Sequence, residues 1–290
     1  MPPIKPHPIS SFENLKERVD RLFRTPTKRL NVRMQMSLDL PLMFSPESAI
    51  EYPTKNIAEF LDFLTDAMPD GDVYLFGGLL RDLALLGRSG FNSDIDLVVE
   101  GSWYNCVAYL ESLGARRNKF GGYRLEVAGW PVDIWNAEET WAIKQGLVRY
   151  KGIASLTDTT VLNWDAILMN WRTKIFICRK NYLEEINTRL LEVVLEKNPN
   201  PLGMAVRVFR HFCLKDARKI TPTAAKYLAN CARTFNFSDL KNSEICSYNN
   251  SVIEPVVYRF FEYFNSDDHI DIHSQFSMAS NLIKKELDLA

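Results

Sequence analysis

The sequence predicts an α+β fold, in which a small mixed β-sheet with helices is followed by an all-α C-terminal domain. Two observations carry this prediction. Short apolar runs typical of strands alternate irregularly with helical patterns up to about residue 180, and only helical periodicity remains after it. Irregular alternation of this kind is typical of α+β architecture. We expect an N-terminal arm and helix over residues 1–45, a head domain over residues 46–180 and a helical neck and body domain over residues 181–290.

Periodicity and turn residues predict each element of the head. After a proline-rich arm, Ser11 is placed to cap a helix that runs to residue 23. Apolar side chains at helical spacing predict a second helix over residues 57–68, which ends before a Pro-Asp-Gly turn. The elements expected after it are a strand 73–76, a helix 79–86, a strand 95–99, a helix 103–113, and strands 121–127 and 131–135, antiparallel neighbours joined through Gly129.

The second part of the chain shows helical periodicity in five segments. They are residues 182–196, 204–218, 223–234, 252–264 and 276–287. The last two are apolar enough to bury a partner as readily as a core. A protein partner and a homo-oligomer therefore stay open.

Composition excludes several classes of protein. The 290 residues are 46% hydrophobic and 24% charged, as in a globular protein, and a net charge of -1 provides no global basic field, so any nucleic-acid surface must be local. The five cysteines never form a Cys-x-x-Cys pair, which indicates reduced thiols. The proline-rich first residues are not expected to act as a secretory leader, and no uncharged apolar run approaches the roughly 20 residues that cross a bilayer. We expect a cytoplasmic protein without a membrane segment.

Residues 71–101 contain the pattern that indicates chemistry. Gly77 and Gly78 follow a predicted strand and precede a helix, where glycines let the backbone and helix N-terminus approach a triphosphate. Alternation along the next strand sends Asp94 and Asp96 to one face, where two carboxylates can share Mg²⁺ or Mn²⁺. Metal-assisted nucleotidyl transfer requires such an arrangement. Asp133, in the later strand 131–135, is the candidate third carboxylate.

The order of these residues resembles a known family. Gly-Gly-x-x-Arg-Asp over residues 77–82, followed by Asp-x-Asp over residues 94–96, is similar to the head of the class II tRNA nucleotidyltransferases and bacterial poly(A) polymerases, within the polymerase-beta-like nucleotidyltransferases. The resemblance is tight over residues 72–101, looser over 102–180 and only topological beyond. It implies triphosphate binding by Gly77 and Gly78, support of the site and sugar by Arg81 and Asp82, and metal binding by Asp94 and Asp96.

The sequence departs from the family in two places. Where the family has an Arg-Arg-Asp segment leading into Asn-Ala, this chain has residues 155–158 and then Asp165-Ala166. In the neck, Arg207 and Arg210 preserve a three-residue arginine spacing, but the acidic pair that reads the base is missing. The two arginines are either a solvated helical face or a phosphate-binding patch, and His211 beside them is interpreted as structural.

Three functions follow from these observations. The first is an enzyme that moves a nucleoside monophosphate from an NTP such as ATP to an acceptor hydroxyl, most simply a tRNA-like RNA 3′ end. The altered neck favours a specialised toxin-like or antiviral enzyme over a housekeeping CCA-adding one. The alternatives are a catalytically silent nucleotide- or RNA-binding module and an enzyme that nucleotidylates a protein acceptor.

Overall fold

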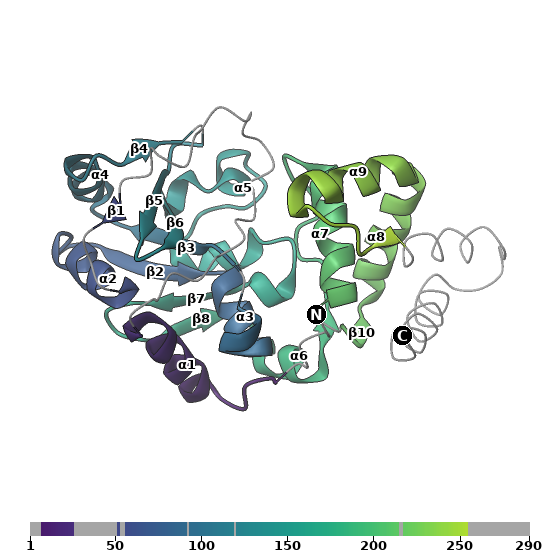
Figure 1. The fold of residues 1–290 in the computed structure, drawn as a ribbon, viewed down its shortest axis with the longest axis horizontal. Helices are drawn as coiled ribbons and strands as arrows, with labels where there is room; N and C mark the ends of the chain where they lie inside the picture. Colours follow the sequence, from purple (N-terminus) through teal and green to yellow (C-terminus); the bar gives the residue numbers. More distant parts are fainter. Residues whose placement is uncertain are drawn as a thin grey trace.

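A mixed sheet of eight strands lies at the centre of the head (Figure 1). The computed structural model describes residues 7–25, 51–52, 56–91, 93–118, 120–214 and 217–254. The strand order is β1-β5-β6-β3-β2-β7-β8, with β4 paired to β5, and β3 runs parallel to β6. The strands are β1 (Glu51–Tyr52), β2 (Asp72–Phe76), β3 (Ile95–Glu100), β4 (Arg116–Arg117), β5 (Tyr123–Val127), β6 (Trp130–Asn136), β7 (Ile167–Asn170) and β8 (Phe176–Cys178).

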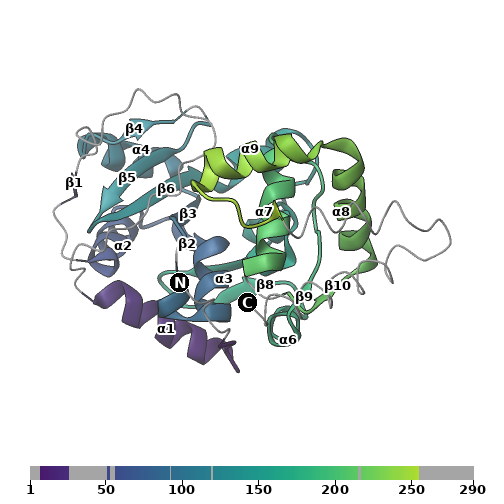
Figure 2. The ribbon, with the colours of Figure 1, turned by 45° about the vertical axis from the view of Figure 1, so that its right-hand side comes forward.

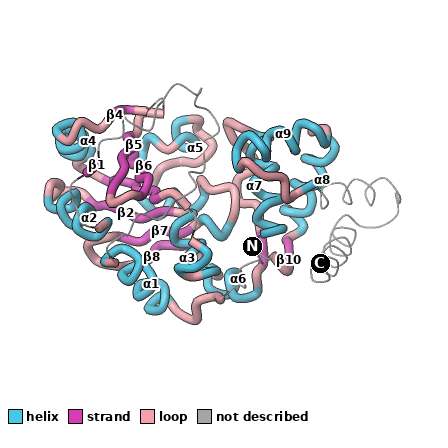
Figure 3. The backbone as a smooth tube through the Cα atoms, in the orientation of Figure 1, coloured by secondary structure: helices cyan, strands magenta, loops and turns pink. Residues whose placement is uncertain are grey.

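Four helices of the N-terminal part and head begin and end close to their predicted positions, and a short fifth helix was not predicted (Figure 3). They are α1 (Phe12–Arg24), α2 (Ile57–Asp66), α3 (Gly78–Leu86), α4 (Trp103–Ser112) and the short α5 (Trp141–Lys144). Ser11 caps α1 as predicted, because its hydroxyl accepts the backbone N–H of Asn14 at 3.3 Å. The α+β prediction is confirmed.

The β5–β6 hairpin also forms as predicted. Ala128 and Gly129 connect the strands with backbone φ angles of 50° and 78°. A two-residue turn with both φ angles positive matches the twist of antiparallel strands, and glycine is the residue that adopts it without strain. The turn fixes the register, which pairs Val127 with Trp130 and Tyr123 with Ile134.

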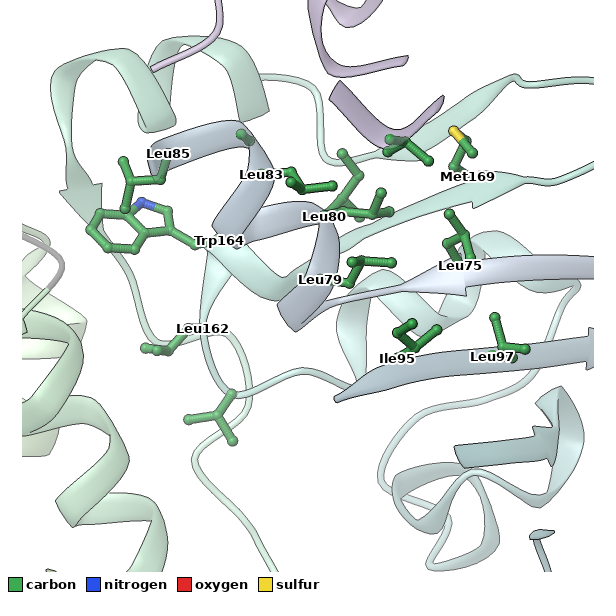
Figure 4. Close-up of a cluster of buried hydrophobic side chains, with 14 of the residues drawn as sticks. Leu75, Leu79, Leu80, Leu83, Leu85, Ile95, Leu97, Leu162, Trp164 and Met169 are labelled. Atoms are coloured by element: carbon green, nitrogen blue, oxygen red, sulfur yellow. The ribbon is translucent and has the colours of Figure 1, made fainter. Parts of the chain in front are cut away.

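The main hydrophobic core lies between α3 and one face of the sheet (Figure 4). Its members share complete or nearly complete burial and come from α3 and the central strands: Leu75, Leu79, Leu80, Leu83, Ile95, Leu97 and Met169. The α1 helix packs on the same core through Leu15 and Val19, and the Arg18 guanidinium donates to the Leu83 carbonyl oxygen at 2.7 Å. Because successive residues of a strand point to opposite faces, the residues that alternate with these apolar side chains lie on the face opposite α3.

A smaller cluster covers part of that opposite face. Tyr74, Val98 and Leu168 from the strands pack there against Ile153 and Leu156 of the following 3₁₀ segment. The cluster does not include Asp96 or Asp133, although alternation places both on this face. Polar side chains on this face are therefore available for chemistry.

The described C-terminal part is mainly helical as predicted, but the helix Phe237–Tyr248 and a pair of short strands were not predicted. Its elements are α6 (Tyr182–Thr188), β9 (Leu190–Leu191), α7 (Pro201–Leu214), β10 (Lys219–Ile220), α8 (Pro222–Thr234) and α9 (Phe237–Tyr248). The predicted helix 182–196 is too long, because Arg189 adopts a left-handed φ of 56° and ends α6. The β9 and β10 strands, which periodicity did not indicate, pair in parallel. The predicted helices 252–264 and 276–287 lie almost wholly outside the described residues.

The α7 helix faces the sheet, and α8 lies on the far side of α7 from the sheet in both views (Figures 1 and 2). Trp164 joins the two parts of the chain. Its fully buried indole N–H donates to the Leu190 carbonyl oxygen at 2.8 Å, and its ring lies beside that of His211 on α7. No helix in the described part of the chain is long and apolar enough to cross a membrane.

Candidate active site

The turn between β2 and α3 places two glycines at the start of a helix. Gly77 has a φ of 63°, caps α3 without a side chain, and donates its N–H to the Ile167 carbonyl oxygen at 3.0 Å. A Cβ atom on Gly78 would lie 3.4 Å from the Ser93 hydroxyl, so this backbone approaches the segment that leads into β3. No side chain satisfies the first N–H groups of α3, which leaves them to an anion.

Four side chains form a row across the sheet on the face opposite α3. The register pairs Arg124 with Asp133, Asp133 with Asp96, and Asp96 with Phe76. Paired residues in neighbouring strands project from the same face, with Cβ atoms about 5 Å apart. The fold therefore places Asp133 directly beside Asp96, although 37 positions separate them in the sequence.

Asp94, which immediately precedes β3, joins this row through Arg124. The Arg124 guanidinium donates from Nη2 to the Asp94 carboxylate at 2.8 Å, and its Nη1 lies 3.5 Å from the Asp133 carboxylate. The side chains of Asp94 and Asp133 are 22% and 23% exposed. One guanidinium thus spans two of the three predicted catalytic carboxylates.

The carboxylates form a partly buried surplus of negative charge. Burial raises the pKa of Asp96 well above its ordinary value, and the charges of Asp133 and Asp94 raise it further, against the opposing charge of Arg207. Burial also raises the pKa of Asp94, and that of Asp133 to about 6, although Arg124 opposes both shifts. A cation at this position would relieve the repulsion.

The donor chemistry of the site fits Mg²⁺. This ion prefers oxygen ligands and is usually held by one or two carboxylates together with substrate phosphates and water. Asp94 and Asp96 provide two such carboxylates. As the side chains lie, no three His, Cys, Asp or Glu residues among those described are arranged to hold one metal. Ligation by Asp133 stays a prediction.

Arg81 and Asp82 lie behind the site, inside the protein. The buried Arg81 guanidinium donates from Nε to the Asp82 carboxylate at 2.9 Å and from Nη1 to Asp165. The Ser93 hydroxyl donates to Asp82 at 2.7 Å and accepts from Arg81 at 3.2 Å. Because Ser93 directly precedes Asp94, this network ties the first carboxylate to α3. It gives Arg81 and Asp82 a supporting position.

The structure separates the two neck arginines. Arg207 is exposed on α7, and its charge weakly opposes the rise in the pKa values of Asp94 and Asp96. The helix thus adds positive charge near the predicted metal site. His211, one turn along, is buried with Nδ1 2.8 Å from the Arg207 carbonyl oxygen, as expected of a structural histidine.

Arg210 instead contacts α9. Its guanidinium forms an ion pair with the fully buried Glu244 carboxylate, donates to the Asn250 side chain at 2.8 Å and lies over the Tyr248 ring. The Glu244 carboxylate also accepts the backbone N–H groups of Val252 and of the next residue. These contacts favour the structural interpretation of Arg210.

The sequence analysis assigned no role to Arg124, Ser93 or Asp165. A signal existed for Arg124, since a two-residue turn at residues 128–129 sets the register that pairs it with Asp133. In the sequence, Asp165 stands out only as a departure from the family pattern. In the structure its carboxylate forms an ion pair with Arg81. No local pattern indicates the Ser93 contacts, which join α3 to a separate segment.

Comparison with solved structures gives the fold of the chain. At 15% identity and a TM-score of 0.50, it is similar to a structure described as a Thermotoga maritima CCA-adding enzyme complexed with tRNA, covering 79% of this chain and 50% of that one. It is similar at 14% identity and a TM-score of 0.51 to a tRNA nucleotidyltransferase complexed with a primer tRNA and an incoming ATP analog, covering 72% of this chain and 62% of that one. A structure described as a tRNA-processing enzyme matches at 15% identity and a TM-score of 0.51, with coverages of 74% and 59%.

These similarities confirm the resemblance at the level of the fold. The mixed sheet followed by helices is the fold that this chain shares with structures described as a CCA-adding enzyme and a tRNA nucleotidyltransferase. The chain spans between half and about three fifths of the length of the proteins it matches. No protein-family model matches it, and no curated protein matches its sequence.

Proposed function

We propose that the protein is a metal-dependent nucleotidyltransferase. It would move a nucleoside monophosphate from an NTP to an acceptor hydroxyl and release pyrophosphate. The observation that carries this proposal is the row of Asp133 and Asp96 across β6 and β3, with Asp94 beside it and the uncapped start of α3 at the end of neighbouring β2. Carboxylates for a metal and amides for a triphosphate are the two binding functions that the reaction needs.

Each part of the site has a role in this reaction. The N–H groups that open α3 would donate to triphosphate oxygens, and Arg207 adds positive charge near Asp96. Asp94 and Asp96 hold Mg²⁺, which supplies charge neutralisation on the phosphates when bound. Asp133, which lies directly beside Asp96, would be the third carboxylate of the metal site.

We propose RNA, in the form of a tRNA-like 3′ end, as the acceptor. Two of the similar structures are described as complexes with tRNA. The absent acidic base-reading pair and Asp165 in place of the family's asparagine favour a specialised enzyme, of toxin-like or antiviral kind, acting in the cytoplasm. A protein acceptor is the alternative that the experiment below separates from RNA.

Incorporation of label tests the proposal. The protein is incubated with Mg²⁺, each α-³²P-labelled NTP in turn, total RNA and a protein extract, and both fractions are then separated on gels. We expect label in tRNA-sized RNA with the wild type and at least a thousandfold less with Asp94→Asn/Asp96→Asn. Asp66→Asn, an exposed aspartate at the end of α2, is the matched control and should retain activity.

The other outcomes separate the alternatives. Label in protein bands alone would replace RNA with a protein acceptor. Binding of an NTP without incorporation by the wild type would favour the catalytically silent module. If no NTP binds with or without metal, the nucleotidyltransferase proposal is refuted.

A further inference from the structure

Arg124 contacts the carboxylates of the site but has no role in the proposed reaction. Its side chain is 35% exposed and reaches from β5 to two carboxylates that belong to different parts of the sheet. Its backbone lies in a strand that is paired on one side with β4 and on the other with β6. The main chain is therefore fixed, and only the side chain is free to change partners.

We propose that Arg124 is a built-in cation that competes with the divalent metal for Asp94 and Asp133, and that it moves to a phosphate of the nucleotide when the metal binds. The inference rests on the proposed function and identifies how its metal and nucleotide sites are coupled. Arg124 is a positioning residue in this proposal, because it affects metal binding through its contacts with the Asp94 and Asp133 carboxylates.

Competition follows from the shared oxygen atoms. The Asp94 oxygen that accepts from Arg124 at 2.8 Å is one of the few hard donors that the site offers to Mg²⁺. A carboxylate held by a guanidinium has one of its oxygens directed at an N–H group instead of a metal. Arg124 contacts two of the three carboxylates at once, through separate guanidinium nitrogens.

Release of Arg124 must be compensated by another anion. Its planar guanidinium suits the oxygens of a phosphate as well as those of a carboxylate. A nucleotide that arrives with its metal supplies that phosphate, whereas a metal alone does not. Metal and nucleotide binding then favour each other, and by linkage the effect is the same in both directions.

A purely structural role makes the opposite prediction. If Arg124 only holds Asp94 and Asp133 in place, its removal lets the carboxylates spread apart and weakens metal binding. If it competes with the metal, removal frees both carboxylates and strengthens metal binding. The direction of the change in metal affinity therefore separates the two roles.

The test is a Mn²⁺ titration of the full chain without nucleotide, with free Mn²⁺ measured by electron paramagnetic resonance. We expect Arg124→Ala to bind Mn²⁺ about fivefold to tenfold more tightly than the wild type. The Mn²⁺ affinity of Arg124→Lys should be intermediate, since lysine keeps the positive charge but lacks the planar, bidentate guanidinium. Arg149→Ala, which removes an exposed arginine elsewhere, should bind as the wild type does. Arg124→Gln replaces the alanine variant if that variant fails to fold.

Inorganic tripolyphosphate then tests the second half of the proposal. At saturating Mn²⁺, the Arg124→Ala variant should bind tripolyphosphate about tenfold more weakly than the wild type and Arg149→Ala. Unchanged or weaker Mn²⁺ binding by folded Arg124 variants, or unchanged tripolyphosphate binding, would overturn the inference. If the wild type labels RNA while these affinities do not change, the inference alone fails. If the affinities change as expected but no NTP is incorporated, the proposed transferase activity fails instead.

Discussion

Replacement of Arg81 by methionine is predicted to destabilise the protein strongly. Methionine keeps much of the side-chain volume but removes the charge that Asp82 and Asp165 share. The Asp82 side chain is 1% exposed and that of Asp165 is 13% exposed, so neither can recover full hydration. Burial opposes the charge of Arg81 itself, but Asp165 and Asp82 more than offset it and raise the pKa of Arg81.

The expected magnitude follows from this arrangement. Removal of one partner of a buried ion pair costs about 3–5 kcal/mol, because it leaves an uncompensated buried charge. Urea denaturation at pH 7.5, monitored by tryptophan fluorescence in EDTA, measures the loss. The Arg81→Met/Asp165→Asn variant should recover roughly 1–2 kcal/mol, since it carries one buried charge fewer.

A pH series checks the physical cause. Without Arg81, burial would raise the pKa of the Asp82 carboxyl in the folded protein above its value in the unfolded chain. The stability deficit of Arg81→Met would then be largest above that folded pKa and would shrink as the pH falls through it. A deficit below about 1 kcal/mol at pH 7.5, or one that does not change with pH, would refute the reasoning.

Two further predictions concern the site. Asp133→Asn should stabilise the metal-free protein at pH 8 by on the order of 3 kcal/mol. The reason is that folding raises the pKa of the Asp133 carboxyl from 3.8 to about 6, so the folded protein disfavours its charged form. The side chain is only 23% exposed, so water screens little of this penalty. That gain should fade between pH 6 and pH 4 in denaturation curves, as the folded wild type takes up its proton, and a variant less stable than the wild type at pH 8 would contradict it. Gly77→Ala and the control Gly146→Ala, with φ angles of 63° and 68°, should each cost about 1 kcal/mol. Only Gly77→Ala should weaken tripolyphosphate binding, and equal weakening by both would count against a phosphate site at Gly77.

Local sequence rules correctly predicted those features that depend only on neighbouring residues. The Ser11 cap and the glycine turn at residues 128–129 depend on neighbours within a few positions, and both form as predicted. The alternation that is predicted to send Asp94 and Asp96 to one side is also a local rule. These features involve short-range hydrogen bonds and backbone angles, which a sequence encodes directly.

Helix lengths in the C-terminal part show the limit of these rules. Apolar periodicity over residues 182–196 continues past Arg189, but the chain leaves the helix there to pair β9 with β10. The competing interaction is 29 residues away in the sequence, because Lys219 pairs with Leu190. A long-range backbone pairing therefore overrode the local preference.

The sequence by itself determined the chemical character of the protein: glycines at a helix start, carboxylates on one strand face, and a further aspartate in a later strand. The tertiary structure alone decided which of these groups meet. The parallel pairing of β3 with β6 brings Asp96 beside Asp133, and α7 turns Arg207 toward them while Arg210 is held by Glu244 on α9. The physical reason is that a residue's periodicity specifies its face, whereas its partner on that face depends on the order of strands and the packing of distant helices.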